Sequence, residues 1–382
     1  MKKKLLIIST SRADFYLLQT LMVKSLKKKI KSKFLLIGSN FGEKGNKVEV
    51  NKNLDKHCIK KIPIELSTNN SANIINFVGV LIKKFQNEIK NTQPDLIVIL
   101  GDRFELLSIA YTATIMKIPI AHIHGGEISE GAFDDNFRHA ITKLSNLHFV
   151  STEVYKKRVI QLGEQKKNVF NVGSLGVQNL QHMNFYKKNE IESRLNIKIN
   201  NKFYIITFHP VTLSKFNESI DNLLTVLNTL KNSTFIFTAP NIDPNNQAIF
   251  KKIKKFVKKN KNSIFINTLG QKMYFSCLKI CNGVIGNSSS GIIEAPSLKI
   301  PTINIGERQG RREMAESVIS CMNNKSAINK AFKKINSKEF KEKILHIKNP
   351  YFKKNTTDQI INIIENIDLK KLIFKSFNDI EF

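Results

Sequence analysis

The sequence predicts an α/β protein of two domains, each built on a parallel β-sheet that is flanked by helices. Three observations lead to this prediction. Short apolar runs of strand length alternate with longer amphipathic segments along the chain. The chain has 382 residues, which is too long for one ordinary α/β core and suits two. The segment from about 172 to 200 contains glycines and a polar run, and a second alternating series follows it.

Each predicted element corresponds to one such run. In the first half, continuous apolar runs are typical of buried parallel strands. We predict strands at 5–9, 34–37, 95–100, 118–123 and 147–150, and helices at 15–28, 73–90, 104–116 and 135–145. In the second half, we predict strands at 204–207, 234–238, 264–266, 283–286 and 301–305, with helices between them and one or two helices at 358–379. We therefore expect domains at 1–175 and 176–382.

The formal net charge of +30 raises the question of a nucleic-acid partner. Lysine is spread along the whole chain, however, and asparagine is abundant beside it. In the basic segment Lys251–Lys261, isoleucine and phenylalanine recur at helical spacing, which indicates a buried face rather than a base-stacking platform. We expect no nucleic-acid partner. A positive field would still attract an anionic substrate.

Targeting and redox signals are weak. The apolar run Leu5–Ile8 is too short for a signal peptide, and the run Ile74–Ile82 contains Asn76 and ends at two lysines. We expect a cytoplasmic protein with no membrane partner.

The cysteines do not have the spacing of a zinc site, so we expect reduced thiols. They are Cys58, Cys277, Cys281 and Cys321.

Polar side chains follow the predicted strands at the ends where ligands bind in such sheets. In the first half these segments are Ser9–Asp14, Gly101–Arg103 and His124–Glu127, and in the second half they are Phe208–Thr212, Asn287–Gly291 and Gly306–Arg308. Arginines at strand ends are suited to holding a diphosphate, because the guanidinium pairs with two oxygens at once. Arg12 and Arg308 are the candidates.

The segment Gly286–Gly291 reads Gly-Asn-Ser-Ser-Ser-Gly and opens an apolar run that we predict to be helical. Free backbone N–H groups at a helix start cradle phosphate, and the hydroxyls of Ser288 and Ser289 add donors. The carboxylate of Glu294, further along, can accept both hydroxyls of a ribose. The same segment is explained equally well by a serine that caps the N-terminus of an ordinary helix.

The segment from His122 to His139 is denser in ionisable groups than structure alone requires. Acids and histidines at a strand end can transfer protons. His122 and His124 share a face of their strand, but no third ligand follows at the usual spacing, so we do not predict a metal site. We interpret His122 as a hydrogen-bonded core histidine.

Together these motifs resemble the hydrolysing UDP-N-acetylglucosamine 2-epimerases of sialic acid biosynthesis. The resemblance runs from the turn Ser11–Asp14 to at least Arg312. It rests on the order and spacing of several segments, each weak alone. These are Gly101–Arg103, His124–Glu127 with Asp134–Ser145, His209–Thr212, and Gly286–Gly291 with Glu294.

The resemblance implies a glycosyltransferase-B-like fold, in which two Rossmann-like domains face each other across a cleft. It also implies a C-terminal helix, about 356–382, that packs back on the N-terminal domain. The implied reaction converts UDP-N-acetylglucosamine and water to N-acetylmannosamine and UDP, by elimination to a 2-acetamidoglucal and then hydration. Such enzymes contribute to bacterial surface polysaccharides. We expect a UDP-sugar substrate, no cofactor, no metal, and a homo-oligomer that is a dimer or a tetramer.

The resemblance also assigns roles to residues. Asp102 and Asp134 would be catalytic carboxylates, Glu127 an active-site acid or an orienting group, and His209 would lie by the glycosidic oxygen and the phosphate. The residues expected to hold UDP are Arg12, Ser288, Ser289, Gly291, Glu294 and Arg308.

One departure leaves the base at C2 open. Many members have Glu where this chain has His124, so either His124 or a neighbouring acid takes that proton. The Glu-Ala-Gly-Leu-Arg pattern of the nonhydrolysing 2-epimerases is absent, which disfavours epimerisation of the intact UDP-sugar.

Three other functions remain open. The first is the same chemistry on a UDP- or GDP-linked 2,4-diacetamido-2,4,6-trideoxy sugar, on the way to legionaminic acid. The second is a glycosyltransferase of the same fold, and the third is a nucleic-acid-binding protein.

Overall fold

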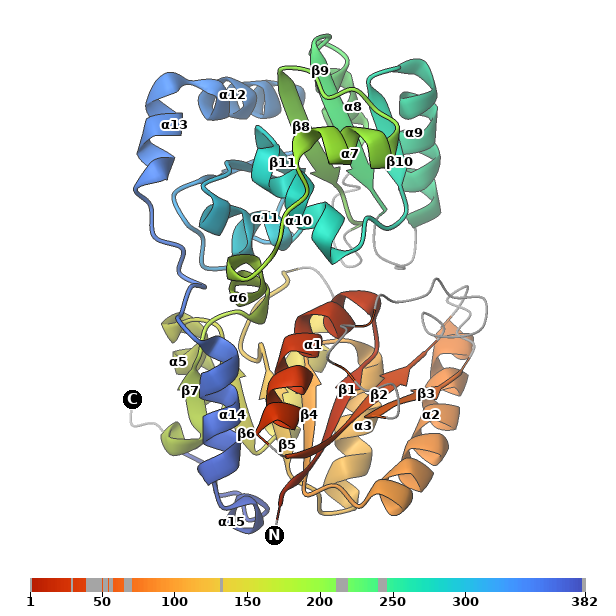
Figure 1. Ribbon diagram of the computed structural model, residues 1–382, viewed down its shortest axis with the longest axis vertical. Helices are drawn as coiled ribbons and strands as arrows, with labels where there is room; N and C mark the ends of the chain where they lie inside the picture. Colours follow the sequence, from red (N-terminus) through yellow and green to blue (C-terminus); the bar gives the residue numbers. More distant parts are fainter. Residues whose placement is uncertain are drawn as a thin grey trace. The chain divides into compact units, whose positions relative to one another are not determined.

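The computed structural model describes residues 2–28, 30–38, 50, 54, 58–64, 71–130, 133–210, 219–239 and 246–379. The chain divides into two compact units, labelled by element in Figure 1. Unit 1 comprises Met1–Glu127, Asp134–Asn179 and Lys353–Phe382, and unit 2 comprises Ile128–Phe133 and Leu180–Phe352. The main division therefore falls between residues 179 and 180, close to the sequence-based boundary at 175, while the short segment 128–133 joins unit 2.

Unit 1 contains a seven-stranded parallel sheet in the order β3-β2-β1-β4-β5-β6-β7. Its strands are β1 (Lys4–Ser9), β2 (Lys31–Ile37), β3 (Ile59–Ile62), β4 (Leu96–Leu100), β5 (Ile120–Ile123), β6 (Leu147–Val150) and β7 (Val169–Asn171). Its helices are α1 (Arg12–Lys27), α2 (Ser71–Thr92), α3 (Phe104–Ile115), α4 (Asp134–Leu144), α5 (Glu153–Gln161), η3 (Lys166–Asn168), α6 (Leu175–Gln181, which runs across the boundary), α14 (Thr356–Asn366) and α15 (Leu369–Leu372).

Unit 2 contains a six-stranded parallel sheet in the order β10-β9-β8-β11-β12-β13. Its strands are β8 (Lys202–Thr207), β9 (Ser233–Thr238), β10 (Ser263–Ile266), β11 (Gly283–Gly286), β12 (Thr302–Ile305) and β13 (Val318–Cys321). Its helices are α7 (Lys188–Leu195), α8 (Asp221–Leu227), α9 (Asn246–Lys259), α10 (Gln271–Ile280), α11 (Ser290–Ile293), η4 (Ala295–Leu298), α12 (Lys325–Asn336) and α13 (Lys338–Leu345).

Both sheets follow the same doubly wound plan. The first strand of each lies in the middle of its sheet, the next two strands extend the sheet to one side, and the fourth strand starts the other side. The order therefore reverses between β1 and β4 in unit 1, and between β8 and β11 in unit 2. In open parallel sheets, ligands bind at the carboxyl ends of the strands beside such a reversal. This topology directs attention to the segments that follow those four strands.

The core of unit 1 lies on both faces of its sheet, as expected for apolar strands such as β4, in which every residue is buried. The α/β prediction is confirmed, and each predicted strand is present. The C-terminal residues belong to unit 1: Ile360 and Ile361 of α14 share a hydrophobic cluster with Phe15 of α1. None of the helices described is both long enough and apolar enough to cross a membrane.

Candidate active site

The first group of predicted residues follows β1 and β4, at the reversal of the first sheet. Arg12 is the first residue of α1, which Ser11 caps by accepting a hydrogen bond from the Asp14 amide at 3.1 Å. Burial raises the pKa of Asp14 to about 6. On α3, the buried carboxylate of Glu105 accepts a hydrogen bond from Arg103 Nη2 at 2.7 Å. Burial alone would lower the pKa of Arg103, but the attraction of Glu105 outweighs it and raises that pKa.

Asp102 is held by an arginine to which the sequence assigned no role. Asp102 forms an ion pair with Arg138 of α4, whose side chain is only 3% exposed. Arg138 also donates hydrogen bonds to the Glu127 backbone oxygen and to Asp135 Oδ1, both at 2.9 Å. One buried guanidinium therefore joins the segments that follow β4 and β5 to α4. A buried arginine with three oxygen partners fixes their positions, because its donors form a planar, rigid fork.

His124 lies at the end of β5 in a left-handed backbone conformation, with φ at 65°. Its ring is nearly buried, and Nδ1 lies 3.6 Å from Glu127 Oε1. The same Glu127 oxygen accepts a hydrogen bond from Ser151 Oγ at 2.9 Å. Backbone strain of this kind persists where the surrounding structure enforces it, and it is concentrated at functional sites. The two groups attract each other when the ring is protonated, but at 3.6 Å they are not hydrogen-bonded to each other.

His122 has the core role that the sequence predicted. It is fully buried in β5, with Nε2 at 2.8 Å from the Gly101 carbonyl and Nδ1 at 3.1 Å from Thr142 Oγ1. Because a carbonyl only accepts, the neutral ring donates its proton from Nε2. Burial lowers the pKa of His122 to about 3, which keeps the ring neutral. This bond fixes the backbone directly before Asp102.

Asp134 is the first residue of α4, and the segment that precedes it belongs to unit 2. Arg312 holds that segment by donating to the Ile128 carbonyl at 2.8 Å and to Ser129 Oγ at 3.3 Å. Asp102, Glu127 and Asp134 are thus tied to α4, either by its first residue or through Arg138. The sequence indicated this cluster by its density of ionisable groups, but it did not indicate that Arg138 joins it.

In unit 2, Asn287 connects three strand ends, through its side chain to His209 and through its backbone carbonyl to Arg308 and Gln309. It accepts a hydrogen bond from the His209 amide at 2.6 Å and donates to the His209 carbonyl at 2.9 Å. The Asn287 carbonyl in turn accepts from Arg308 at 3.2 Å and from Gln309 at 3.0 Å. The residues that follow β8, β11 and β12 are therefore joined at one point. His209 and Arg308, both predicted site residues, are brought together there.

The His209 ring is buried beside a positive charge. Burial, together with the charge of Arg308, holds the pKa of His209 well below its usual range. A neutral imidazole has one N–H to donate and no charge of its own to repel a cation. Val211 and Thr212, which follow it in the predicted motif, lie outside the described residues.

The run after Gly286–Gly291 is helical, as predicted, but it consists of two short pieces. α11 is a single turn, and Glu294 lies at its junction with η4. One turn has little macrodipole, so the backbone and side chains of the loop must bind any phosphate themselves. Gly286 has φ at +131°, and a Cβ there would lie 1.9 Å from the Thr207 oxygen, so glycine is required.

The remaining predicted residues of unit 2 lie along this loop. Ser288, Ser289 and Glu294 are partly exposed. Tyr274 of α10 lies beside Ser290 and Glu294, and burial, with the Glu294 charge in addition, raises the pKa of Tyr274. No sequence signal pointed to this tyrosine. Gly291 faces β12 instead: its carbonyl accepts from Thr302 Oγ1 at 2.7 Å, and a Cβ would lie 2.6 Å from Thr302 Cγ2.

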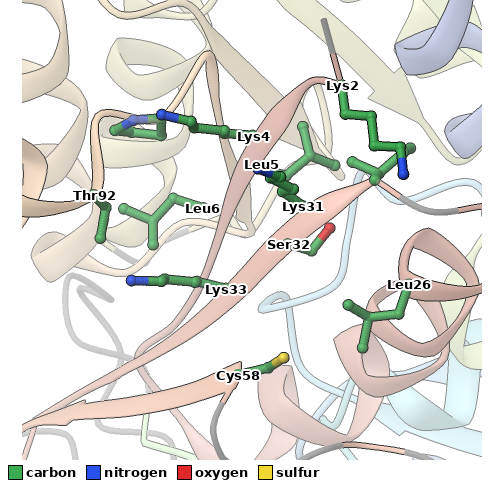
Figure 2. A pocket seen from close by; sticks show the side chains of 12 residues that line it. Lys2, Lys4, Leu5, Leu6, Leu26, Lys31, Ser32, Lys33, Cys58 and Thr92 are labelled. Atoms are coloured by element: carbon green, nitrogen blue, oxygen red, sulfur yellow. The ribbon is translucent and has the colours of Figure 1, made fainter.

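A pocket of about 510 Å³ lies at the opposite, amino-terminal edge of the first sheet (Figure 2). It is lined by apolar residues, Cys58 and four lysines, of which Lys4 and Lys31 begin β1 and β2. None of the predicted site residues lines it. In the part of the chain that the structure describes, no group of three or more His, Cys, Asp or Glu side chains is placed to hold a metal ion.

Comparison with known proteins adds to this geometry. A family model described as UDP-N-acetylglucosamine 2-epimerase matches residues 24–365. The chain is 39% identical to the GDP/UDP-N,N'-diacetylbacillosamine 2-epimerase (hydrolyzing) of Campylobacter jejuni, over 99% of this chain and 100% of the relative. It is 36% identical to the polysialic acid biosynthesis protein P7 of Escherichia coli, over 99% and 98% of the two chains.

The fold agrees with solved structures. The crystal structure of UDP-GlcNAc 2-epimerase from Neisseria meningitidis bound to UDP-GlcNAc matches with a TM-score of 0.74 at 19% identity, over 94% of this chain and 99% of that chain. This likeness supports the two-domain, glycosyltransferase-B-like class. The family model and the full-length relatives go further, and the protein is a member of the UDP-N-acetylglucosamine 2-epimerase family.

Proposed function

We propose that the protein is a hydrolysing 2-epimerase that acts on UDP-N,N'-diacetylbacillosamine, releasing UDP and the free 2-epimer of the sugar. The observation that carries this proposal is the 39% identity, along 99% of the chain, to a relative named for the GDP- or UDP-linked form of this sugar and for hydrolysis. N,N'-diacetylbacillosamine is a 2,4-diacetamido-2,4,6-trideoxy sugar, so this is one of the alternatives that the motifs left open. It replaces UDP-N-acetylglucosamine as the first choice.

UDP-N-acetylglucosamine is the second candidate substrate. The family model carries its name, and the relative with 36% identity is named for polysialic acid biosynthesis. The two sugars share the 2-acetamido group at which the chemistry occurs and differ at C4 and C6. The same proton transfers would serve both.

The proposed reaction has two steps. A base removes the proton from C2 while the C1–O bond breaks, which releases UDP and leaves a C1–C2 double bond. Water then adds: its oxygen bonds to C1, and a proton reaches C2 from the opposite face. One UDP-sugar and one water thus give one UDP and one free sugar that is inverted at C2.

The acids of unit 1 are suited to these proton transfers. Asp102 and Asp134 are the candidate carboxylates, and His124 and Glu127 are two further buried groups that can take part in proton transfer to the substrate. The ion pair with Arg138 holds Asp102 in place. Such positioning can supply a large part of a rate enhancement, because the entropy cost of bringing the reacting groups together is already met in the folded protein.

The loops of unit 2 are suited to holding UDP. Arg308 supplies charge for a diphosphate, and neutral His209 beside it can donate one hydrogen bond to a phosphate or glycosidic oxygen. Ser288 and Ser289 add hydroxyl donors, and Glu294 can accept from the ribose. Arg12, the first residue of α1 in unit 1, stays a candidate diphosphate ligand on the sequence argument alone. The contact of Gly291 with Thr302 supports a packing role for that glycine.

The proposal is tested by following both UDP-sugars with the enzyme in deuterated water by NMR. We expect free UDP and the free 2-epimer, with one deuterium at C2, and a higher kcat/KM for the diacetamido sugar. A product that still carries UDP, or no turnover of either sugar, would contradict the proposed reaction. A higher kcat/KM for UDP-N-acetylglucosamine would contradict only the choice of substrate.

A further inference from the structure

The pocket at the amino-terminal edge of the first sheet has the size of a small-molecule site. Its volume is about 510 Å³, within the range of about 300–1,000 Å³ that is usual for such sites. All of its lining residues belong to unit 1, and none of them is a predicted residue of the active site. The active-site segments of unit 1 follow the carboxyl ends of the strands, so a ligand in this pocket lies at the opposite edge of the sheet.

The pocket lies where β2 begins before its neighbour β3. β2 starts at Lys31, but β3 pairs with it only from Phe34 to Ile37. On its other side, β2 pairs with β1 from its first residue. Among the strands of the described chain, the first three residues of β2 therefore have a partner on one side only. These three residues line the pocket, together with the beginning of β1 and the last turns of α1 and α2.

The floor of the pocket is apolar. Leu5 and Leu6 of β1 and Ile30 are buried, and Leu26 and Pro94 complete this part of the lining. Apolar side chains around a cavity of this size favour a ligand with an apolar body, because binding removes apolar surface of both from water. A small inorganic ion would gain nothing from this floor.

Positive charge surrounds the apolar floor. Within the described residues, four lining lysines form no ion pair and donate no side-chain hydrogen bond: Lys2, Lys4, Lys31 and Lys33. Lys3 differs from them, because its ammonium donates to the carbonyls of Ile364 and Glu365 at 2.7 and 2.8 Å. Asp95 accepts from the backbone N–H of Lys4 at 2.8 Å and offsets one of the four charges. The pocket stays positive and attracts an anion.

The side chain of Ser32 supplies a position for one polar atom of a ligand. Ser32 is 4% exposed and lines the pocket, and its Oγ has no hydrogen-bond partner within the described part of the chain. A buried hydroxyl without a partner costs free energy, and a hydroxyl can donate to an anionic oxygen. Figure 2 shows Ser32 between Lys2 on one side and Lys33 on the other. An oxygen bound at Ser32 would therefore have lysines on both sides.

We propose that this pocket binds an organic anion, a carboxylate or a phosphate monoester, that carries an apolar group. The lysines and Ser32 hold the anionic head, and the apolar floor holds the body. UDP has no apolar body for the floor, and an uncharged hydrocarbon leaves the lysines and the Ser32 hydroxyl without a partner. The proposal does not depend on the proposed reaction, since the two sites share no residue.

The test follows the alkylation of Cys58, which lines the pocket and is partly exposed. The full chain is treated with iodoacetamide, with and without decanoate or decyl phosphate below micellar concentrations, and each cysteine is followed by peptide mass spectrometry. We expect at least one of the two anions to slow the modification of Cys58. Cys321, which is partly exposed in unit 2, is the internal control and should react at an unchanged rate. Decanol, inorganic phosphate and UDP should protect Cys58 much less.

Charge reversal tests the part of the lysines. Lys31→Glu combined with Lys33→Glu should raise the concentration of the anion that half-protects Cys58 by about tenfold, because two attractions become repulsions. Lys83→Glu combined with Lys157→Glu is the control with the same net charge, since both lysines are exposed in unit 1 and neither lines the pocket. It should leave that concentration unchanged. All four positions are exposed, so both double variants should fold.

Three results would overturn the proposal. The first is no protection of Cys58 by either anion, and the second is equal protection by decanol, which would remove the role of the charge. The third is an equal effect of the two double variants, which would assign the attraction to the net charge of the chain rather than to the pocket. Protection by only one of the two anions would identify the head group.

Discussion

At the scale of single residues, His124 stands out by its backbone. Non-glycine residues in the left-handed region cost about 1–3 kcal/mol, and the rest of the fold must compensate. Gly126, two residues further on, also has a positive φ, which glycine adopts at no cost, whereas His124 does so with a side chain. The strained residue lies against Glu127, in the cluster that Arg138 organises. We interpret the strain as the cost of directing this ring toward the carboxylate.

The first residue-scale prediction concerns the proposed proton carriers. Asp102→Asn, Asp134→Asn and His124→Asn should each lower kcat by about 10²-fold or more, because each removes a proton-transfer group. Asparagine is chosen at 124 because it tolerates the left-handed backbone. UDP affinity, measured by calorimetry, should stay near the wild-type value.

The matched control for these variants is Asp135→Asn. Asp135 also contacts Arg138, at 2.9 Å, but it has no proposed role in proton transfer. It should retain most of the wild-type kcat. Each variant is first checked for folding by circular dichroism, because Arg138 is buried and a lost carboxylate leaves its charge less compensated. Near-wild-type rates for both Asp102→Asn and Asp134→Asn would mean that the chemistry lies on other residues.

At the scale of elements, the site residues lie in the segments that follow strands or in the first turn of the helix that comes next. The one-turn α11 shows why this matters. Its loop is held by Asn287 and by the close approach of Gly286 to Thr207, so its position derives from β8 and β11. A rigid strand end can position Glu294 without a long helix behind it.

The element-scale prediction for this loop is Glu294→Gln. The change keeps the size of the side chain but weakens its acceptance of two ribose hydroxyls. We expect UDP binding to weaken by about 1–3 kcal/mol, the range for hydrogen bonds to a charged group. If the contact is equal in the ground state and the transition state, KM should rise more than kcat falls. Unchanged UDP affinity by calorimetry would place the nucleotide elsewhere.

The buried histidines on β5 and β6 predict how stability depends on pH. Burial lowers the pKa of His122 to about 3 and also lowers the pKa of His148. Below about pH 6.5 the unfolded chain binds protons at these rings that the folded chain does not. Above that pH, keeping the two rings neutral costs the folded protein nothing. As the pH drops below it, the free energy of unfolding should fall by up to about 1.4 kcal/mol per pH unit for each ring.

The measurement is urea unfolding at several pH values between 7 and 5, for wild type and His122→Gln. The variant keeps a donor for the Gly101 carbonyl but cannot titrate, so its stability should fall less steeply. His346→Gln, on an exposed residue, should leave the wild-type slope unchanged. Asp14 changes the pH dependence of stability in the opposite direction, because burial raises its pKa to about 6. Wild type and both variants contain Asp14, so its effect cancels when their slopes are compared. Equal slopes for wild type and His122→Gln would contradict this account.

At the scale of the whole molecule, the C-terminal residues are anchored to unit 1 by buried charge. Glu164, which is 2% exposed, lies 2.8 Å from Lys375 and 3.1 Å from Lys143, and it accepts from His148 at 2.9 Å. Lys375 also donates to the carbonyls of Lys143 and Ser145. Three cationic or donor partners around one carboxylate offset much of the free energy that its burial costs. These contacts hold the C-terminal segment around Lys375 against α4 and the residues around Glu164 in unit 1.

The sequence by itself determined the α/β class and the central strands, because a strand buried on both faces must be continuously apolar. It did not predict β3, β7 and β13, which lie at sheet edges. Edge strands are short and partly exposed, and β3 has two lysines among its four residues, so the apolar signal is lost.

The same distinction applies to the site. Residues directly after central strands, such as Asp102, His124 and Asn287, lie at a predictable sheet edge, so their neighbourhood followed from the sequence. The roles of Arg138 and Tyr274 did not, since each is on a helix and reaches the strand ends only through tertiary packing. The division of the helical run into α11 and η4 also became visible only in the structure. Periodicity reports which face of an element is buried, and only the folded chain decides which side chains meet there.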